Sequence, residues 1–192
     1  IKDGCVAVAL SWLALCIFGA IPFVASGCIP HPIDALFETV SGFTTTGSSI
    51  LTDVEVLPHC ILIWRSFTHW IGGMGVLVFL LSLLPLAGGY HMNLMKAESP
   101  GPSVSKLVPK VQSTAKILYT IYFGMTLIQL ALLLIGRVPL FDSLCITFGT
   151  AGTGGFGIVN DSLGSYSTYC QVVTTAFSTS SVARISLRSC AL

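Results

Sequence analysis

Two short stretches of glycine and hydroxyl residues carry the chemistry that this sequence offers. Ser41–Ser49 reads Ser-Gly-Phe-Thr-Thr-Thr-Gly-Ser-Ser, and residues 150–157 read Thr-Ala-Gly-Thr-Gly-Gly-Phe-Gly. Both lie between apolar segments in a chain with little charge. Backbone carbonyl and hydroxyl oxygens can replace the water shell of a cation. Glycine permits the backbone conformations that turn successive carbonyls toward one axis. Each stretch is therefore a candidate ion-selectivity filter.

The two stretches belong to an internal repeat. A shift of 108 residues along the chain places Asp34 on Asp142. The same shift aligns Leu36 with Leu144, Thr39 with Thr147, Thr45 with Thr153 and Gly47 with Gly155. A short apolar segment precedes each stretch, and as a helix it would point its negative C-terminal end at the ion, which favours a cation over an anion.

The composition indicates an integral membrane protein of the all-α class. Charged residues make up 9% of the chain and hydrophobic residues 53%, with a mean hydropathy of +0.86; soluble domains have about 25% and about 45–50%. The net charge of +1 excludes a basic face for nucleic acid. No nucleophile and base can be placed in one pocket, so we do not expect an enzyme. Residues 152–157 match G-x-G-x-x-G, but no predicted strand precedes them, so a dinucleotide site is rejected.

Repeated units of helix, pore helix, filter loop and helix follow from the apolar pattern. A bilayer core needs about 20 apolar residues to be crossed by a helix, and shorter segments fit re-entrant pore helices. We predict the first pore repeat at 1–87, with spans at about 5–25 and 60–86, the pore helix at about 31–43 and the filter at 44–49. The second, incomplete repeat is predicted at 114–177, with a span at about 117–136, the pore helix at about 139–149 and the filter at 150–157.

Lysines between the repeats set the predicted orientation. Residues 88–113 contain Lys96, Lys106 and Lys110 against Glu98 alone, so the positive-inside rule makes this loop cytoplasmic. Residues 178–192 form an aberrant tail, because serines and two arginines interrupt the apolar pattern. We expect a frameshifted or truncated C-terminus, and the sequence resembles a piece of a longer chain.

Charged residues at predicted membrane depth are the remaining candidates. Arg65 and His69 lie one helical turn apart in the second span, and Glu38 lies in the first pore helix. They are either a gate or proton site, or a structural group in which Glu38 neutralises Arg65; we favour the structural interpretation. The seven cysteines show no CxxC pair and are expected to be inert thiols.

Two long motifs resemble those of a known family. Phe37 to Ser48 reads Phe-Glu-Thr-Val-Ser-Gly-Phe-Thr-Thr-Thr-Gly-Ser, and Trp64 to Gly75 reads Trp-Arg-Ser-Phe-Thr-His-Trp-Ile-Gly-Gly-Met-Gly. Both are similar to motifs of the Trk-type potassium uptake proteins, in the superfamily that includes Ktr and plant HKT transporters. The resemblance covers about residues 1–175.

The resemblance implies a pore of four such repeats, of which this chain has two. Gly47 and Gly155 would be the filter glycines. Thr45 and Thr46, with Thr153 and Gly154, would offer carbonyls to potassium, which is the substrate; no cofactor is expected. The implied partners are the lipid bilayer, the remaining pore repeats, a second copy in a homodimer and a cytoplasmic nucleotide-binding regulatory subunit near loop 88–113. The implied location is the bacterial inner membrane, crossed several times.

Two alternatives stay open. The chain could be a non-transporting fragment or membrane scaffold, because two filter strands cannot surround an ion. It could also conduct sodium or several cations. Serine at a filter glycine position is associated with sodium in the plant relatives, so glycine at both positions favours potassium.

Overall fold

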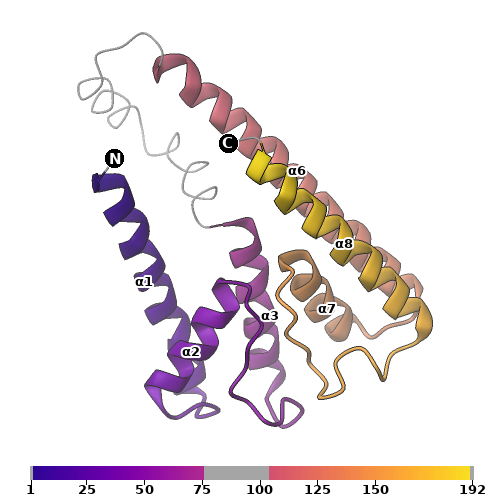
Figure 1. The fold of residues 1–192 in the computed structure, drawn as a ribbon. Helices are drawn as coiled ribbons and strands as arrows, with labels where there is room; N and C mark the ends of the chain where they lie inside the picture. Colours follow the sequence, from indigo (N-terminus) through magenta and orange to yellow (C-terminus); the bar gives the residue numbers. More distant parts are fainter. Residues whose placement is uncertain (1, 76–103, 191–192) are drawn as a thin grey trace. The chain divides into compact units, whose positions relative to one another are not determined.

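The computed structural model describes residues 2–75 and 104–190, and every regular element in these ranges is an α-helix, in agreement with the predicted all-α class. The helices are shown in Figure 1. In chain order they are α1 (Lys2–Ala25), α2 (Pro32–Phe43), α3 (His59–Met74), α6 (Val104–Ile135), α7 (Leu140–Gly152) and α8 (Thr168–Cys190).

The chain divides into two compact units. The first comprises Ile1–Gly73 and Met125–Leu192, and the second comprises Met74–Gly124. Both candidate filter stretches lie in the first unit. In the second unit, α6 begins at Val104, so the last part of the predicted loop 88–113 is helical. Leucine, lysine and glutamine in this part favour a helix, and Pro100 and Pro102 precede it. Pro109 lies in the second turn of α6, where its missing N–H removes one backbone hydrogen bond. Residues 88–103 lie outside the described residues.

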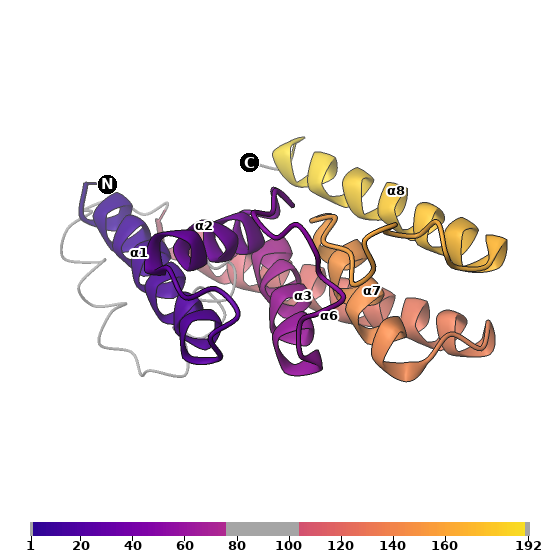
Figure 2. The ribbon, with the colours of Figure 1, turned by 90° about the horizontal axis from the view of Figure 1, so that it is seen from below.

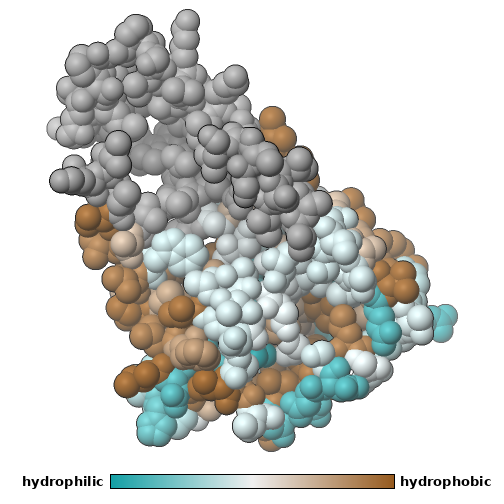
Figure 3. All heavy atoms as spheres, in the orientation of Figure 1, coloured by the Kyte–Doolittle hydropathy of each residue, from teal (hydrophilic) through white to brown (hydrophobic). Residues whose placement is uncertain are grey.

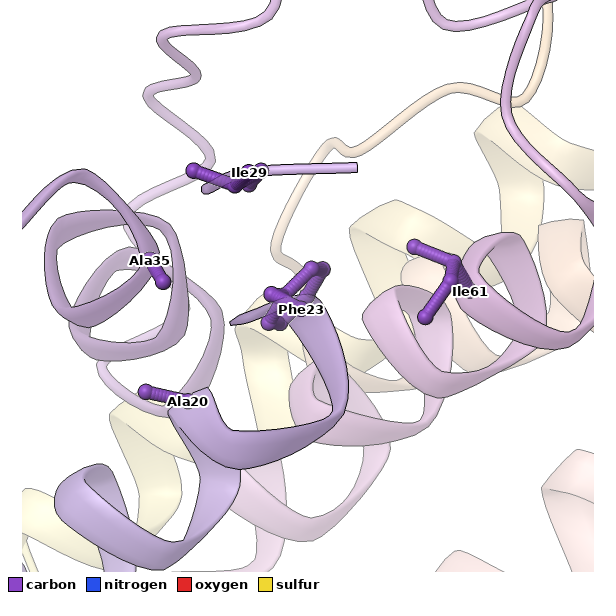
Figure 4. Close-up of a cluster of buried hydrophobic side chains, with 5 residues drawn as sticks. All are labelled: Ala20, Phe23, Ile29, Ala35 and Ile61. Atoms are coloured by element: carbon purple, nitrogen blue, oxygen red, sulfur yellow. The ribbon is translucent and has the colours of Figure 1, made fainter. Parts of the chain in front are cut away.

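Helices α1 and α2 pack closely because a glycine lies at their contact. A Cβ added to Gly19 would lie 2.7 Å from the Phe43 ring and 2.8 Å from the Thr39 methyl group. Beside this contact, buried apolar side chains from α1, α2, α3 and the turn after α1 form one cluster (Figure 4). Its members are Ala20, Phe23, Ile29, Ala35 and Ile61.

The second repeat has its own core, and a further cluster joins the two repeats. Leu133, Val138, Ile146 and Cys170 pack together from α6, α7 and α8, and α7 lies beside α8 in Figures 1 and 2. Val54 and Leu62, from the first repeat, pack with Cys145 and Ile158 from the second. Burying apolar area contributes about 25 cal/mol per Å², so this shared cluster stabilises α3 against α7.

Among the described residues, Lys116–Ile135 is long and apolar enough to cross a membrane, and Ala9–Ala25 is a shorter apolar helix. Figure 3 shows apolar residues along α1, whose large side chains are mostly exposed. The predicted span 60–86 is described only as far as residue 75. Helix α8 continues to Cys190, through most of the segment expected to be an aberrant tail. Serine and arginine are compatible with a helical backbone, although they are unfavourable toward lipid.

Candidate ion-filter site

The two short helices begin at equivalent positions of the repeat. Helix α2 begins at Pro32 and α7 at Leu140, which are separated by the same 108 residues as the sequence repeat. Proline assists both starts: it is the first residue of α2, where its missing N–H has no cost, and Pro139 is the N-cap of α7. Asp34 and Asp142 lie in the first turns, where a carboxylate interacts favourably with the helix dipole.

The two helices also end in the same hydrogen-bonded turn. In the first repeat, Thr45 N–H donates to Gly42 O at 3.1 Å and Thr46 N–H donates to Ser41 O at 3.0 Å. In the second repeat, Thr153 N–H donates to Thr150 O at 3.0 Å and Gly154 N–H donates to Gly149 O at 3.0 Å. Each pair of bonds is a Schellman motif, which satisfies carbonyls at the helix end. Every donor and acceptor in one motif maps onto the other at the shift of 108.

Threonine occupies the left-handed position of both motifs. Thr45 has φ 55° and Thr153 has φ 57°. Glycine is the usual residue at this position, because a β-branched side chain is disfavoured at positive φ. Such backbone strain costs on the order of 1–3 kcal/mol and persists only where the surroundings hold it in place. The same strained turn follows the short helix in each of the two repeats, which marks these loops as candidate functional sites.

The glycines predicted to belong to the filter follow two residues later, and there the two loops meet. Gly47 has φ +77° and Gly155 has φ +91°, a region that glycine enters readily. A Cβ on Gly47 would overlap the carbonyl oxygen of Gly154, whereas a Cβ on Gly155 would find open space. The structure therefore brings the first candidate loop directly against the second.

Glu38 supports the end of the first loop from within α2. Its side chain is fully buried. The carboxylate accepts hydrogen bonds from Ser49 Oγ at 2.9 and 3.1 Å and from Ile50 N–H at 3.1 Å. Arg65 Nε donates to Glu38 Oε1 at 2.6 Å, so the ion pair that the sequence suggested is present.

Arg65 extends this support to the second loop. Its Nη1 atom donates to Gly157 O at 2.9 Å. Its guanidinium group lies 3.7 Å from the centroid of the Phe156 ring, a cation–π arrangement. Gly157 and Ser49 are equivalent positions at the shift of 108. One buried Glu38–Arg65 pair thus holds the end of both candidate loops.

His69 lies one turn after Arg65 and also contacts both repeats. The side chain is fully buried. Nδ1 lies 2.7 Å from Gly42 O, at the end of α2, and Nε2 lies 3.3 Å from the backbone nitrogen of Phe156. The imidazole stacks on the Phe156 ring with centroids 4.0 Å apart.

Small residues let α3 approach both short helices, α2 and α7, closely. A Cβ on Gly42 would overlap the Thr68 hydroxyl group, and a Cβ on Gly72 would overlap the Phe43 carbonyl oxygen. In the second repeat, a Cβ on Gly152 would overlap the carbonyl oxygen of His69. Helix α3 is therefore in backbone contact with the C-terminal ends of both α2 and α7.

A polar contact joins the two segments that follow the loops. Asn160 Oδ1 accepts from Val54 N–H at 3.0 Å, and Asn160 Nδ2 donates to Asp53 Oδ1 at 2.9 Å. Asn160 N–H donates to Glu55 Oε1 at 3.1 Å. The hydrogen bond from Asn160 lowers the pKa of the Asp53 carboxyl group below its ordinary value, because it stabilises the charged form.

Comparison with known proteins identifies the family. The TrkH family, described as cation transport proteins, matches residues 1–181. The chain belongs to the TrkH family. The Trk system potassium uptake protein TrkH of Halomonas elongata is 37% identical over 179 residues, which is 92% of this chain and 37% of that protein. TrkH of Escherichia coli K12 is 38% identical over 167 residues, which is 86% of this chain and 35% of that protein.

A solved structure of the TrkH family has the same fold. The crystal structure of the potassium transporter TrkH from Vibrio parahaemolyticus matches with a TM-score of 0.72 and 30% sequence identity, covering 92% of this chain and 35% of that one. The chain spans about a third of the length of the TrkH relatives that it matches. These relatives are named for potassium uptake or transport, which is consistent with the expectation that this chain is not an enzyme.

Sequence reasoning missed two members of this candidate site. Phe156 and Gly157 contact Arg65 and His69, but they were assigned only to the loop. The repeat contained a signal for this. Glu38 supports Ser49 in the first loop, whereas the equivalent of Glu38 in the second repeat is Ile146, which cannot accept a hydrogen bond through its side chain. The second loop therefore needed a partner from elsewhere in the chain.

Proposed function

We propose that this chain supplies two strands of a potassium-selective filter in a Trk-type uptake protein. The carbonyl groups of Thr45, Thr46 and Gly47 in one loop, and of Thr153, Gly154 and Gly155 in the other, are the proposed potassium ligands. Glu38, Arg65 and His69 support these loops rather than bind the ion. The protein crosses the bacterial inner membrane several times, with 1–87 and 114–177 as pore repeats and 88–113 in the cytoplasm.

The observation that carries this proposal is the doubled backbone signature. Two loops 108 residues apart have a left-handed threonine followed by a positive-φ glycine, after helices that end in the same turn. Strain of this kind, repeated at equivalent positions, is expected where backbone groups must point in set directions. Contact between Gly47 and the Gly154 carbonyl supports placing both loops in one filter.

The directions of two carbonyls support their role as ligands. In a planar trans peptide, the N–H and C=O groups point in opposite directions. Thr46 N–H points back into the end of α2, so the Thr45 carbonyl points away from that helix. Gly154 N–H points back into α7, so the Thr153 carbonyl points away from that helix. A cation held beyond the two helix ends would meet both oxygens and the negative ends of both helix dipoles.

Exposed apolar side chains support a location in the bilayer. Several large hydrophobic residues on α1 are more than half exposed; they include Leu10 at 60%, Leu13 at 60%, Ile17 at 57% and Phe18 at 70%. Contiguous apolar surface of this kind is unfavourable in water and marks a contact with lipid or with other protein. Two filter strands cannot enclose an ion, so the proposed assembly includes the remaining repeats. The resemblance to the Trk-type proteins adds to this proposal a homodimeric partner and a cytoplasmic nucleotide-binding regulatory subunit near 88–113.

Potassium uptake tests the proposal, in cells that lack their own uptake systems and express the full-length transporter containing this chain. We expect uptake with potassium preferred over sodium. Gly155→Ser should lower this preference, as a hydroxymethyl group beside the ion path disturbs carbonyl spacing. Gly27→Ser is the matched control, because Gly27 has φ +72° and open space around a Cβ but lies outside both loops. Equal selectivity in both variants would remove Gly155 from the filter.

The same measurement separates the alternatives. Sodium uptake equal to potassium uptake in the parent protein would favour a sodium or mixed-cation transporter. A correctly inserted parent that transports neither ion would favour the membrane scaffold.

A further inference from the structure

We propose that His69 is a positioning residue for the second filter strand: it fixes the direction of the Gly155 carbonyl by accepting the hydrogen bond of the Phe156 N–H group. The inference rests on the proposed function, in which that carbonyl is a potassium ligand. It assigns to His69 a role in ion selectivity that differs from simple packing.

The two contacts of the His69 ring define its tautomer. Gly42 O has no proton to give, so Nδ1 donates to it across 2.7 Å. Phe156 N–H has only a proton to give, so Nε2 accepts from it across 3.3 Å. A neutral imidazole with its proton on Nδ1 satisfies both groups. The ring thereby joins the end of α2 in the first repeat to the loop of the second.

The bond to Phe156 controls a carbonyl that His69 does not touch. The Phe156 N–H and the Gly155 C=O belong to one peptide unit, so they point in opposite directions. Holding the N–H toward α3 therefore holds the oxygen on the opposite face of the strand. Gly155 needs such a restraint, since a glycine at φ +91° with open space around it meets little steric resistance to rotation of its peptide.

The surroundings keep the imidazole in place. It stacks on the Phe156 ring, with an interplanar angle of 21°. A Cβ on Gly154 would overlap the ring of His69, so the strand runs directly across its edge. Arg65 contacts Phe156 and bonds Gly157. The second loop is thus held from α3 at two points, the Phe156 N–H group and the Gly157 carbonyl group.

The first loop is held at a different peptide unit, and this isolates His69 as specific to the second loop. Glu38 accepts the N–H of Ile50, which shares its peptide unit with the Ser49 carbonyl and not with that of Gly47. The residue equivalent to Glu38 in α7 is Ile146, which has no side-chain acceptor, and the Phe156 N–H group donates to His69 on α3. At the shift of 108, the counterparts of Arg65 and His69 on α8 are Val173 and Phe177, which offer no side-chain acceptor. The His69 contact is therefore not a repeated packing feature.

Two substitutions in the full-length transporter separate the acceptor role of His69 Nε2 from the donor role of Nδ1. His69→Gln can place an oxygen near the position of Nε2 and keep the acceptor for Phe156 N–H. His69→Asn can place its amide near Nδ1 and keep the donor to Gly42 O, while losing that acceptor. We expect His69→Asn to lower the ratio of potassium to sodium flux in liposomes about fivefold, as for the loss of one buried hydrogen bond. His69→Gln should retain more of the selectivity.

Nitrogen NMR of the wild-type protein in lipid provides a second measurement that does not depend on transport. With ¹⁵N-labelled histidine, the resonance missing from the His69→Asn spectrum assigns His69. A neutral ring with the proton on Nδ1 supports the proposal, and a ring with the proton on Nε2 overturns it. Wild-type selectivity in a folded His69→Asn protein also overturns it. Absence of potassium flux in the wild type would instead count against the proposed function, and the NMR signature would still test the contact.

Discussion

Neutralising Glu38 is the sharpest test of how the two loops are supported. Glu38→Gln keeps the size of the side chain and one carbonyl oxygen, but it removes the charge that faces Arg65. In the structure the carboxylate receives three donors: Arg65 Nε, Ser49 Oγ and Ile50 N–H. After the substitution, Gly157 O and the face of Phe156 are the described partners that still compensate the guanidinium.

The expected loss follows from burial. Arg65 is 3% exposed and Glu38 is 0% exposed, so water does not replace the lost partner. Removing one member of such a pair costs about 3–5 kcal/mol, mostly because the remaining charge is left uncompensated. Arg65→Gln should cost a similar amount, because Glu38 keeps the hydroxyl and N–H donors but no cation. In the double variant two neutral amides face each other, so its loss should be smaller than the sum by about 2 kcal/mol.

Unfolding in mixed detergent micelles measures this coupling. Trp64 and Trp70 lie on α3 and report its release by fluorescence. Glu55→Gln is the matched control, since this exposed carboxylate accepts one hydrogen bond from Asn160 N–H and should lose less than about 1 kcal/mol. If the double variant loses as much stability as the two single variants together, the shared role of the pair is refuted. Stable but inactive single variants would show instead that the pair acts directly in transport.

Two further predictions concern the second repeat. Thr153→Gly should raise the free energy of unfolding by up to about 1 kcal/mol, because glycine relieves the strain of the left-handed conformation. The control is Thr120→Gly, at an exposed position within α6, which should lower the free energy of unfolding by about 1 kcal/mol. A lower free energy of unfolding in both variants would contradict the strain at Thr153. Burial and then the hydrogen bond to Asp142 raise the pKa of Tyr166. Stability from this group is therefore complete below pH about 10 and decreases as the pH rises toward the folded-state pKa. Melting temperatures between pH 8 and 11 should show a smaller alkaline decrease for Tyr166→Phe than for the wild type, and parallel curves would contradict the assignment.

Local patterns predicted the elements of this fold better than its contacts. Proline at the helix starts and the repeated Asp positions are local signals, and α2 and α7 begin where the shift of 108 places them. Pairing of Arg65 with Glu38 was predictable, because a buried cation needs an anion and Glu38 was available. Its bond to Gly157 was not, since any carbonyl can accept a hydrogen bond and the choice depends on the tertiary path of 92 residues. Helix α6 begins earlier than predicted because polar residues do not by themselves end a helix, and the single Pro109 near its start does not end it either.

The contact that α3 makes between the two repeats is not symmetric. The first repeat contributes Arg65 and His69, and the second contributes the backbone of Phe156 and Gly157, so the two surfaces that meet are different. In the language of assemblies this is a heterologous, head-to-tail interface, unlike the self-complementary interface of a twofold pair. Contacts of this type are all satisfied only when successive units rotate until the last meets the first. A closed ring of repeats around a central axis is the arrangement that this head-to-tail direction favours, and its other contacts need different side chains, because α8 has Val173 and Phe177 at the positions equivalent to Arg65 and His69.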